Sequence, residues 1–301
     1  MSSPSNFKQG TSVTPGSVKS LLVVSDPEIN LIMRDQLLTR DWLVEYVASN
    51  QEALSVAQQR PFDLIITSLA TSAKEDVELL RKIRNIRAHT RMIIRTREST
   101  TQDVVEALRQ RAFSYFSQPC SAASLSEAIR MAMEEPVWDD GIEVASASTN
   151  WIRLLVRCDV GTGERVMQFF NEIADLPEDE KAQVAYALRE MLMNAITHGG
   201  QFDPRQYVEV SYVRGKKGVA CRIKDPGKGF TIDELLHAAV SNPLDDPMRH
   251  MQVREAVGLP PGGFGILLSR QLVDEVIYNE AGNEVLLVKY LDNPASTPFH
   301  A

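Results

Sequence analysis

The sequence predicts an α/β protein with two domains, because two different patterns of strands and helices follow one another along its 301 residues. In the first half, short apolar runs rich in β-branched residues alternate with segments of helical periodicity. This alternation predicts a flavodoxin-like, doubly wound parallel sheet over residues 18–135. In the second half, strand pairs combine with longer helices, so we expect a second α/β domain over residues 151–292. Residues 1–17 and 293–301 are expected to be tails.

The first domain is expected to begin with a buried strand and a capped helix. Leu21-Leu-Val-Val24 is a continuous apolar run, which is typical of a strand that is buried on both faces. Asp26 and Pro27 then predict a helix start, because a proline in the first turn loses no hydrogen bond. The expected strands cover residues 21–24, 43–47, 62–67, 92–94 and 114–116. The expected helices cover residues 26–39, 51–59, 74–86, 101–109 and 125–133.

This layout resembles a response-regulator receiver domain, and the residues at the strand ends show where it departs from that family. Receivers have an acid pair after the first strand, an aspartate that accepts the phosphoryl group after the third, and a Thr or Ser after the fourth. A Lys-Pro pair follows their fifth strand. Here these positions hold Ser25-Asp26, Ser68, Thr96 and Gln118-Pro119.

The substitutions remove the chemistry that a receiver needs. The hydroxyl of Ser68 cannot form an acyl phosphate, and one remaining carboxylate gives too few oxygen ligands for tight Mg²⁺ binding. Because Gln118 is neutral, a phosphoryl group would also lack its counter-ion. We therefore expect a degenerate receiver, or pseudo-receiver, with the alternative that another α/β fold shares this layout. In either case the domain would serve as a protein-interaction or dimerisation module.

Residues 136–150 are expected to form a linker with room for one extended segment, since Pro136 stops the last helix of the first domain. A helix that begins near Leu176 should run to His198 and stop at Gly199-Gly200. The other expected helices of the second domain cover residues 163–173, 233–240 and 266–273. Its expected strands cover residues 151–157, 207–213, 219–223, 275–279 and 284–290.

Three short segments of the second domain carry residue types that suit a ligand site. Glu190, Asn194 and His198 recur every four residues, so they form a polar stripe on an otherwise apolar helix. The stripe could be one wall of a site or a solvated edge. The run Asp225-Pro-Gly227-Lys-Gly229-Phe230 follows a predicted strand.

In that run, the glycines permit positive φ and close approach of the backbone to a flat ligand, and Asp225 can accept a hydrogen bond from an exocyclic amine. An ordinary strand-to-helix turn is the alternative. The third segment, Gly262-Gly263-Phe-Gly265, opens a helix, where free N–H groups and the helix dipole attract anions.

Residues 231–261 contain several proline breaks between the second and third segments, and a weakly ordered stretch of this length predicts a functional lid. The lid carries Arg249, His250 and Arg254, which are expected on the phosphate side of the site.

In this order and on these elements, the three segments resemble the N, G1 and G2 boxes of the GHKL (Bergerat-fold) ATPases. The resemblance implies a mixed sheet with helices on one face, and ATP with Mg²⁺ as cofactors. Within the group, the runs MLMNAITHGG and DEVIYNEAGNEVLLVKYL are most similar to anti-sigma-factor serine/threonine kinases. The long lid departs from that family.

The resemblance also implies a role for each site residue on the base side. Asp225 would bind the adenine amine, and Gly227 and Gly229 would shape the base pocket.

On the phosphate side, the resemblance implies that Asn194 holds the Mg²⁺ that bridges the ATP phosphates, while Gly263 and Gly265 cradle the phosphates. Glu190 would be the general base. His198 would either orient phosphate or cap its helix.

Two outputs are compatible with these boxes. In the first, the protein phosphorylates Ser or Thr on an anti-sigma-antagonist (STAS) protein and can also sequester a sigma factor. In the second, it is a nucleotide-gated binding module without phosphotransfer. A hybrid sensor histidine kinase is disfavoured, since the linker between the two domains contains no phosphoacceptor histidine.

The composition indicates a cytoplasmic protein. The net charge of −8 and pI near 5.3 argue against a nucleic-acid partner. No apolar run is long enough to cross a membrane, and Met1–Ser17 lacks the apolar core of a signal peptide. The three cysteines have no metal-ligand spacing and suggest reduced thiols. A homodimer is compatible with these observations.

Overall fold

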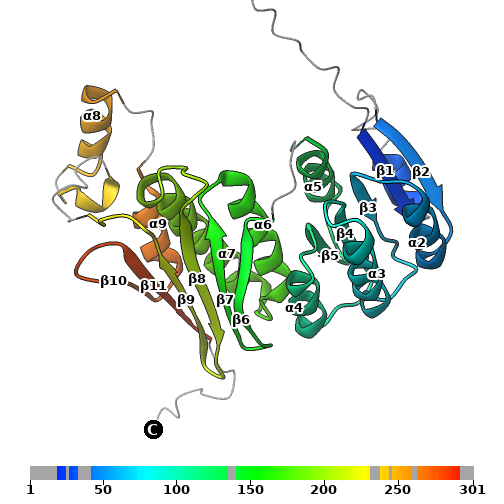
Figure 1. The fold of residues 1–301 in the computed structure, drawn as a ribbon. Helices are drawn as coiled ribbons and strands as arrows, with labels where there is room; N and C mark the ends of the chain where they lie inside the picture. Colours follow the sequence, from blue (N-terminus) through cyan, green and yellow to red (C-terminus); the bar gives the residue numbers. More distant parts are fainter. Residues whose placement is uncertain are drawn as a thin grey trace, which may run out of the picture.

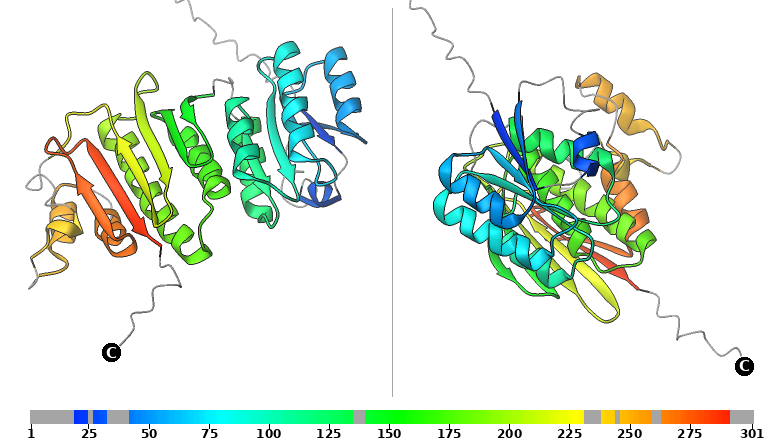
Figure 2. Two further views of the ribbon diagram at one scale, coloured as in Figure 1. Left: turned by 90° about the horizontal axis from the view of Figure 1, so that it is seen from below. Right: turned by 90° about the vertical axis from the view of Figure 1, so that its right-hand side faces the viewer.

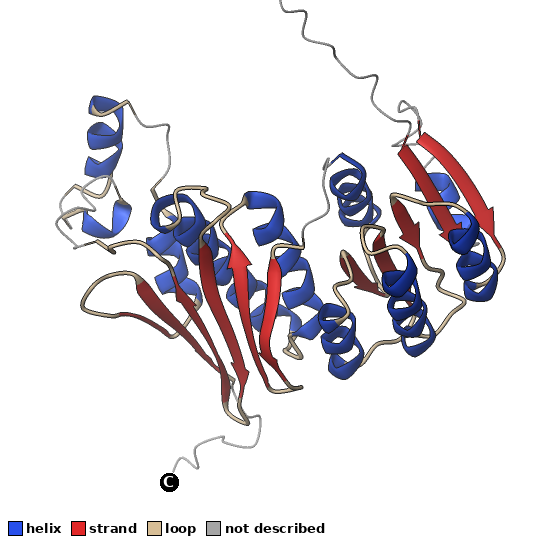
Figure 3. Ribbon diagram, viewed as in Figure 1, coloured by secondary structure: helices blue, strands red, loops and turns tan. Residues whose placement is uncertain are grey.

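The computed structural model describes residues 19–24, 27–32, 42–134, 140–230, 238–243, 246–258 and 263–291. Within these ranges the chain forms two sheets that lie in succession along the molecule, each with its own helices (Figures 1 and 3). Ser25-Asp26, which stand at the position of a receiver's acid pair, lie outside the described residues, and so does most of the predicted helix at residues 233–240.

The first sheet has five strands in the order β2-β1-β3-β4-β5, and all of its neighbouring pairs are parallel. Its strands are β1 (Lys19–Val24), β2 (Trp42–Val47), β3 (Leu64–Ile66), β4 (Arg91–Thr96) and β5 (Ser114–Ser117). Its helices are α1 (Pro27–Ile32), α2 (Asn50–Gln59), α3 (Ala73–Ile86), α4 (Thr101–Arg109) and α5 (Ala122–Glu134).

Helices cover both faces of this sheet, as a doubly wound fold requires. Along β1, Leu22 and Val24 pack in one buried cluster with residues of α2, α3 and α4. The alternate residues Leu21 and Val23 pack in a second cluster with α1 and α5. Because both faces of the strands are buried, their apolar runs are continuous rather than alternating. The predicted doubly wound parallel sheet is confirmed.

Capping residues explain why two helices of this domain begin where the sequence predicts. Ser72 accepts a hydrogen bond from the Glu75 N–H, and the Glu75 carboxylate accepts one from the Ser72 N–H in return. Thr100 and Asp103 form the same reciprocal pair at the start of α4. Each pair satisfies two backbone donors that the first turn leaves free.

The second sheet has six strands in the order β10-β11-β9-β8-β7-β6. Its strands are β6 (Ile142–Ala147), β7 (Trp151–Arg157), β8 (Tyr207–Arg214), β9 (Gly218–Lys224), β10 (Glu275–Tyr278) and β11 (Glu284–Tyr290). Its helices are α6 (Val160–Ile173), α7 (Glu178–Asn194), α8 (Arg249–Ala256) and α9 (Gly265–Leu272). The α/β class is confirmed, with the refinement that all neighbouring pairs in this sheet are antiparallel.

The helices α6, α7 and α9 lie behind this sheet in Figure 1, and Figure 2 shows the same arrangement from two other directions. Ile152, Leu154 and Val156 of β7 face them and are buried. On the opposite face, Trp151 and Val213 are exposed. The sheet therefore has one face in the core and one face toward solvent.

The extended segment that the sequence allowed within the linker is strand β6, which pairs with β7 and so belongs to the second sheet. Two other features of the second domain differ from the sequence expectations. The long helix ends at Asn194 and continues as a π-helical turn over Ala195–Gly199, which includes His198. The expected lid contains the helix α8 rather than weakly ordered chain alone.

Candidate functional site

All eight site residues that the sequence singled out line one cavity of about 430 Å³ in the second domain. A cavity of this size is within the range of small-molecule sites. The eight residues are Glu190, Asn194, His198, Asp225, Gly227, Gly229, Gly263 and Gly265. The cavity thus brings together residues that lie far apart in the sequence. Its lining comes from α7, from the ends of β9 and β11 and from the start of α9.

The first wall of the cavity is the polar side of α7 and of the π-helical turn that follows it. Glu190 and Asn194 are half-buried and lie one turn apart on α7, whereas His198 lies on the π-helical turn and is more exposed. Met191 and Leu192 on the same helix are buried in the core. The stripe of the sequence analysis is therefore a cavity wall.

Asp225 follows β9 and is held by backbone groups. Its N–H donates to the Asn283 carbonyl at 3.0 Å, and its Oδ1 accepts the Gly227 N–H at 2.7 Å. A side chain on Gly199 would collide with the Asp225 carboxylate, so this glycine leaves room for the carboxylate. Burial raises the pKa of Asp225, and the Gly227 hydrogen bond opposes that rise. The second carboxylate oxygen can still accept a hydrogen from an amine in the cavity.

The positive φ that the sequence analysis allowed for is present at Gly229, whose φ is +81°. The close approach has a different partner than expected, because a Cβ at this position would overlap the Ala281 carbonyl rather than a ligand. Gly282 has a φ of +76° and approaches the Phe230 backbone in the same way. Asn283 joins the two loops, since its Nδ2 donates to the Gly227 carbonyl at 3.1 Å. The glycines thus allow two loops to pack backbone against backbone, which holds the segment that carries Asp225.

The start of α9 faces the wall formed by α7. The residue before the helix, Phe264, provides no side-chain cap for the first N–H groups. A side chain on Gly265 would collide with the Glu190 carboxylate, so this carboxylate lies directly against the helix start. Uncapped N–H groups at a helix N-terminus suit the binding of phosphate. The arrangement can place an anionic group between the helix start and the α7 wall.

The lid is attached to this helix start by His250, which is fully buried. The His250 ring contacts the Phe264 ring edge to face with 4.6 Å between centroids, and its Nδ1 lies 2.6 Å from the Asn242 Nδ2. His250 thus lies beside the helix start, on the side where the phosphates are expected, but in a buried contact rather than in the lining of the cavity. Arg254 lines the cavity.

Three residues that build the cavity are not among the site residues predicted from the sequence. Asn283 bridges two loops, Tyr278 contacts Phe230 ring to ring at 5.2 Å, and Lys228 adds a cation to the lining. A signal for Lys228 was present, because it lies between the two glycines of the second segment. Asn283 and Tyr278 act through contacts that span about fifty residues, and no local pattern reveals them.

In the first domain, the residues at the positions that are functional in receivers lie at or just after the ends of strands. Ser68 follows β3 and is buried, and its hydroxyl accepts the Ala70 N–H at 3.0 Å. Thr96 ends β4, and its hydroxyl donates to the Glu98 carbonyl at 2.9 Å. The side-chain Oε1 of Gln118 accepts the Cys120 N–H at 3.4 Å.

No cluster of three or more His, Cys, Asp or Glu side chains suited to a metal ion occurs in the described part of the chain. Likewise, no helix among the described residues is long and apolar enough to cross a membrane.

Two protein-family models match this chain, one in each half. Residues 21–130 match the response regulator receiver domain, and residues 159–289 match the histidine kinase-like ATPase domain.

Among curated relatives, the transcriptional regulatory protein GlrR of Escherichia coli (strain K12) is 28% identical over 115 residues, which cover 38% of this chain and 26% of GlrR. The transcriptional regulatory protein ZraR of Salmonella typhimurium is 24% identical over 155 residues, which cover 51% of this chain and 34% of ZraR. The chain thus spans only about a quarter to a third of the length of these relatives.

Solved structures also match the first half. A CheY-like receiver domain protein from Methanospirillum hungatei JF-1 is 26% identical with a TM-score of 0.34, and the match covers 39% of this chain and 95% of that protein. A response regulator from Thermotoga maritima is 18% identical with a TM-score of 0.35, and the match covers 39% and 99% of the two chains.

The two domain matches agree with the two sheets and with the position of the cavity. The chain therefore joins a response-regulator receiver domain at residues 21–130 to a histidine kinase-like ATPase domain at residues 159–289.

Proposed function

We propose that this protein is an ATP-dependent kinase that phosphorylates Ser or Thr on an anti-sigma-antagonist (STAS) protein, as the anti-sigma-factor serine kinases that it resembles do. The observation that carries the proposal is the position of Glu190. Its carboxylate lies against the start of α9 and one turn before Asn194, in the cavity that also holds Asp225. The residues proposed as base, metal ligand and adenine acceptor thus line one cavity.

The volume of the cavity and the polar groups in its lining support the binding of ATP. Asp225 has a carboxylate oxygen for the adenine amine, held in place by the Gly227 N–H. The uncapped start of α9, with Gly263 and Gly265, suits the phosphates. Asn194 would supply an oxygen to Mg²⁺, whose remaining ligands would be phosphate oxygens and water, as is usual for this ion.

ATP supplies the phosphoryl group, and the chain supplies positioning and a base. The hydroxyl oxygen of the partner forms a bond to the γ-phosphorus while the bond to the bridging oxygen of ADP breaks. Glu190 would accept the proton that the hydroxyl loses. The start of α9 and the cationic Lys228 would stabilise the charge on the phosphate oxygens.

The receiver domain is proposed to be degenerate. Ser68 stands where the phosphoacceptor aspartate of a receiver would be, and its buried hydroxyl already accepts the Ala70 N–H. Under this proposal the receiver takes part in signalling through protein contacts rather than through phosphorylation.

Transfer of label from radioactive ATP to a STAS protein of the same genome tests the kinase activity. We expect label on a Ser or Thr of the partner, and we expect Glu190→Gln to reduce the rate by about 10²- to 10⁴-fold, the usual effect of a general base. Glu178→Gln is the matched control, since Glu178 is an exposed glutamate in the first turn of the same helix. If the protein binds ATP but labels no STAS protein, the kinase proposal fails and a nucleotide-gated binding module remains.

A further inference from the structure

Strand β5 is the outer strand of the receiver sheet, and helix α6 of the ATPase domain covers its outer edge. The strand order ends β4-β5, so no described strand pairs with the other side of β5. The edge of a sheet carries backbone N–H and C=O groups that need partners. In this protein the partners are side chains of α6.

Three polar residues of α6 bond to this edge at regular spacing. The Gln168 Nε2 donates to the Tyr115 carbonyl at 3.1 Å. The Glu172 carboxylate accepts the Ser117 N–H at 3.1 Å and also the Ser117 hydroxyl. The third residue is Arg165, so the helix contributes positions i, i+3 and i+7 of a single face. These side chains take the place of a sixth strand.

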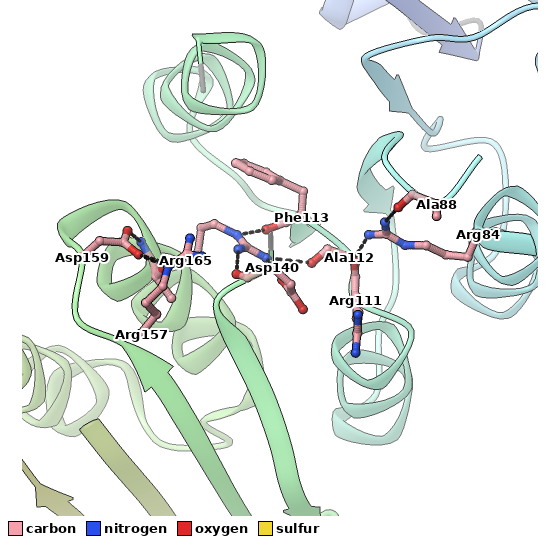
Figure 4. Close-up of polar contacts among 10 residues, drawn as sticks. Arg84, Ala88, Arg111, Ala112, Phe113, Asp140, Arg157, Asp159 and Arg165 are labelled. Carbon is pink, nitrogen blue, oxygen red and sulfur yellow. Dashed lines mark hydrogen bonds and ion pairs between the residues drawn. The ribbon is translucent and has the colours of Figure 1, made fainter. Parts of the chain in front are cut away.

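Arg165 ties the receiver to the beginning of the ATPase domain, as Figure 4 shows. Its Nε donates to the Phe113 carbonyl at 2.8 Å, and its guanidinium lies 4.6 Å above the centre of the Phe113 ring. The same group donates to the Ala112 carbonyl, to the Asp140 carbonyl at 2.6 Å and to the Asp140 carboxylate at 2.6 Å. Arg165 is only 4% exposed, so this charge is satisfied almost wholly by the interface.

Another face of α6 packs against the end of α7 and the π-helical turn that follows it. A Cβ on Gly163 would lie 2.6 Å from the Met193 Cε and 2.9 Å from the Ile196 Cδ1, so the side chains of this segment lie directly against the α6 backbone. Met193 immediately precedes Asn194, and Ile196 lies in the π-helical turn between Asn194 and His198. A displacement of α6 would therefore press on the side chains of the segment that carries Asn194.

We infer that α6 couples the edge of β5 to the ATP site, so that nucleotide binding and the docking of the receiver on α6 favour one another. The inference rests on the proposed binding of ATP, but it does not depend on phosphotransfer. The partner of the β5 edge is then the ATPase domain of the same chain. Because energetic coupling between two sites is reciprocal, a protein that binds the receiver and loosens its docking would also weaken nucleotide binding.

Hydrogen exchange of the full-length protein with and without Mg-ATP tests this coupling. We expect Mg-ATP to slow exchange in the peptide that contains Ser117, which lies in the other domain from the cavity. In the double variant Gln168→Ala, Glu172→Ala, we expect this protection to disappear and the Kd for Mg-ATP to rise about fivefold or more, the lower range of typical allosteric coupling. Arg165 is left in place so that its buried charge stays paired.

Asn171→Ala is the matched control, because Asn171 is exposed on the same helix. It should leave both the protection and the Kd unchanged. The single variant Gln168→Ala repeats the test with a smaller perturbation, and unchanged exchange in α2 and α3 shows that the receiver remains folded. If Mg-ATP binds but leaves the Ser117 peptide unprotected, or if the double variant binds Mg-ATP as the wild type does, the coupling is refuted. If the wild type does not bind Mg-ATP, the proposed function fails instead.

Discussion

At the scale of single residues, Asp76 of the receiver domain carries a carboxyl group whose pKa is raised by burial. It lies on α3 and is fully buried, with its Oδ1 accepting the Asn50 Nδ2 at 2.6 Å. Burial raises the pKa of Asp76 to about 6, and hydrogen bonds to the carboxylate oppose the rise. The folded protein therefore holds the proton more tightly than the unfolded chain does.

This pKa predicts how stability changes with pH. A raised carboxyl pKa stabilises the fold at low pH, and the contribution is lost as the pH rises from about 4 through about 6. Asp76→Asn removes the titration and keeps the shape of the side chain. We expect the free energy of unfolding of the variant, relative to wild type, to increase by up to about 3 kcal/mol between pH 4 and pH 7. Urea unfolding of both proteins across this range, followed by tryptophan fluorescence, measures the difference. A difference that does not vary with pH would show that Asp76 titrates normally.

The positions of the site residues could be predicted from the sequence, but the physical reason for each residue type could be predicted only in part. Glu190 and Asn194 follow from helical spacing alone, since both lie on one face of α7. Gly229 was assigned to close approach of a ligand, whereas its missing side chain makes room for the Ala281 carbonyl. That contact joins positions about fifty residues apart, so a local sequence pattern does not reveal it.

At the scale of elements, the residues at the receiver positions and the proposed adenine acceptor all lie at or just after the ends of strands. Asp225 follows β9 in the ATPase domain, and Ser68 and Thr96 stand at the ends of β3 and β4 in the receiver. In the ATPase domain this position is filled by a carboxylate with room beside it. In the receiver it is filled by a buried serine whose hydroxyl is already hydrogen-bonded.

A small phosphodonor distinguishes a degenerate receiver from an active one. We expect acetyl phosphate with Mg²⁺ to leave the chain unmodified, because a serine hydroxyl cannot form an acyl phosphate and Gln118 offers no counter-ion. Intact mass spectrometry of the treated protein reports any added phosphoryl group. A hydroxylamine-sensitive phosphate on residues 21–130 would refute the degenerate receiver.

Elements with strong local signals were predicted almost to the residue, and elements that depend on distant partners were not. The helix α4 was predicted at its observed bounds, and in the structure Thr100 and Asp103 cap its start. By contrast, β6 has mixed small and polar residues and becomes a strand only because β7 lies beside it. The π-helical turn after Asn194 also escaped prediction, since its sequence continues an ordinary helical pattern.

At the scale of the whole molecule, the two domains share one continuous apolar core and a polar seam. Buried residues of α4 and β5 in the receiver belong to the same cluster as those of α6 and α7 in the ATPase domain. Arg165, Gln168 and Glu172 add hydrogen bonds across the junction. The sequence predicts two domains and a linker but does not predict this seam, because the bonds join residues that lie more than fifty positions apart. The receiver is thus an integral support of the ATPase domain rather than a tethered module.

We propose that ATP binds through Asp225 in the cavity between α7, β9 and α9. Calorimetric titration of the full-length protein with Mg-ATP measures this binding. We expect one site per chain in the wild type and in Asp179→Asn, which changes an exposed aspartate in the first turn of α7. For Asp225→Asn we expect the affinity to fall about ten- to a hundredfold, since a hydrogen bond to a charged group contributes about 1.5–3 kcal/mol. Equal affinity of Asp225→Asn and wild type, or no binding by the wild type, would contradict the assignment of this cavity.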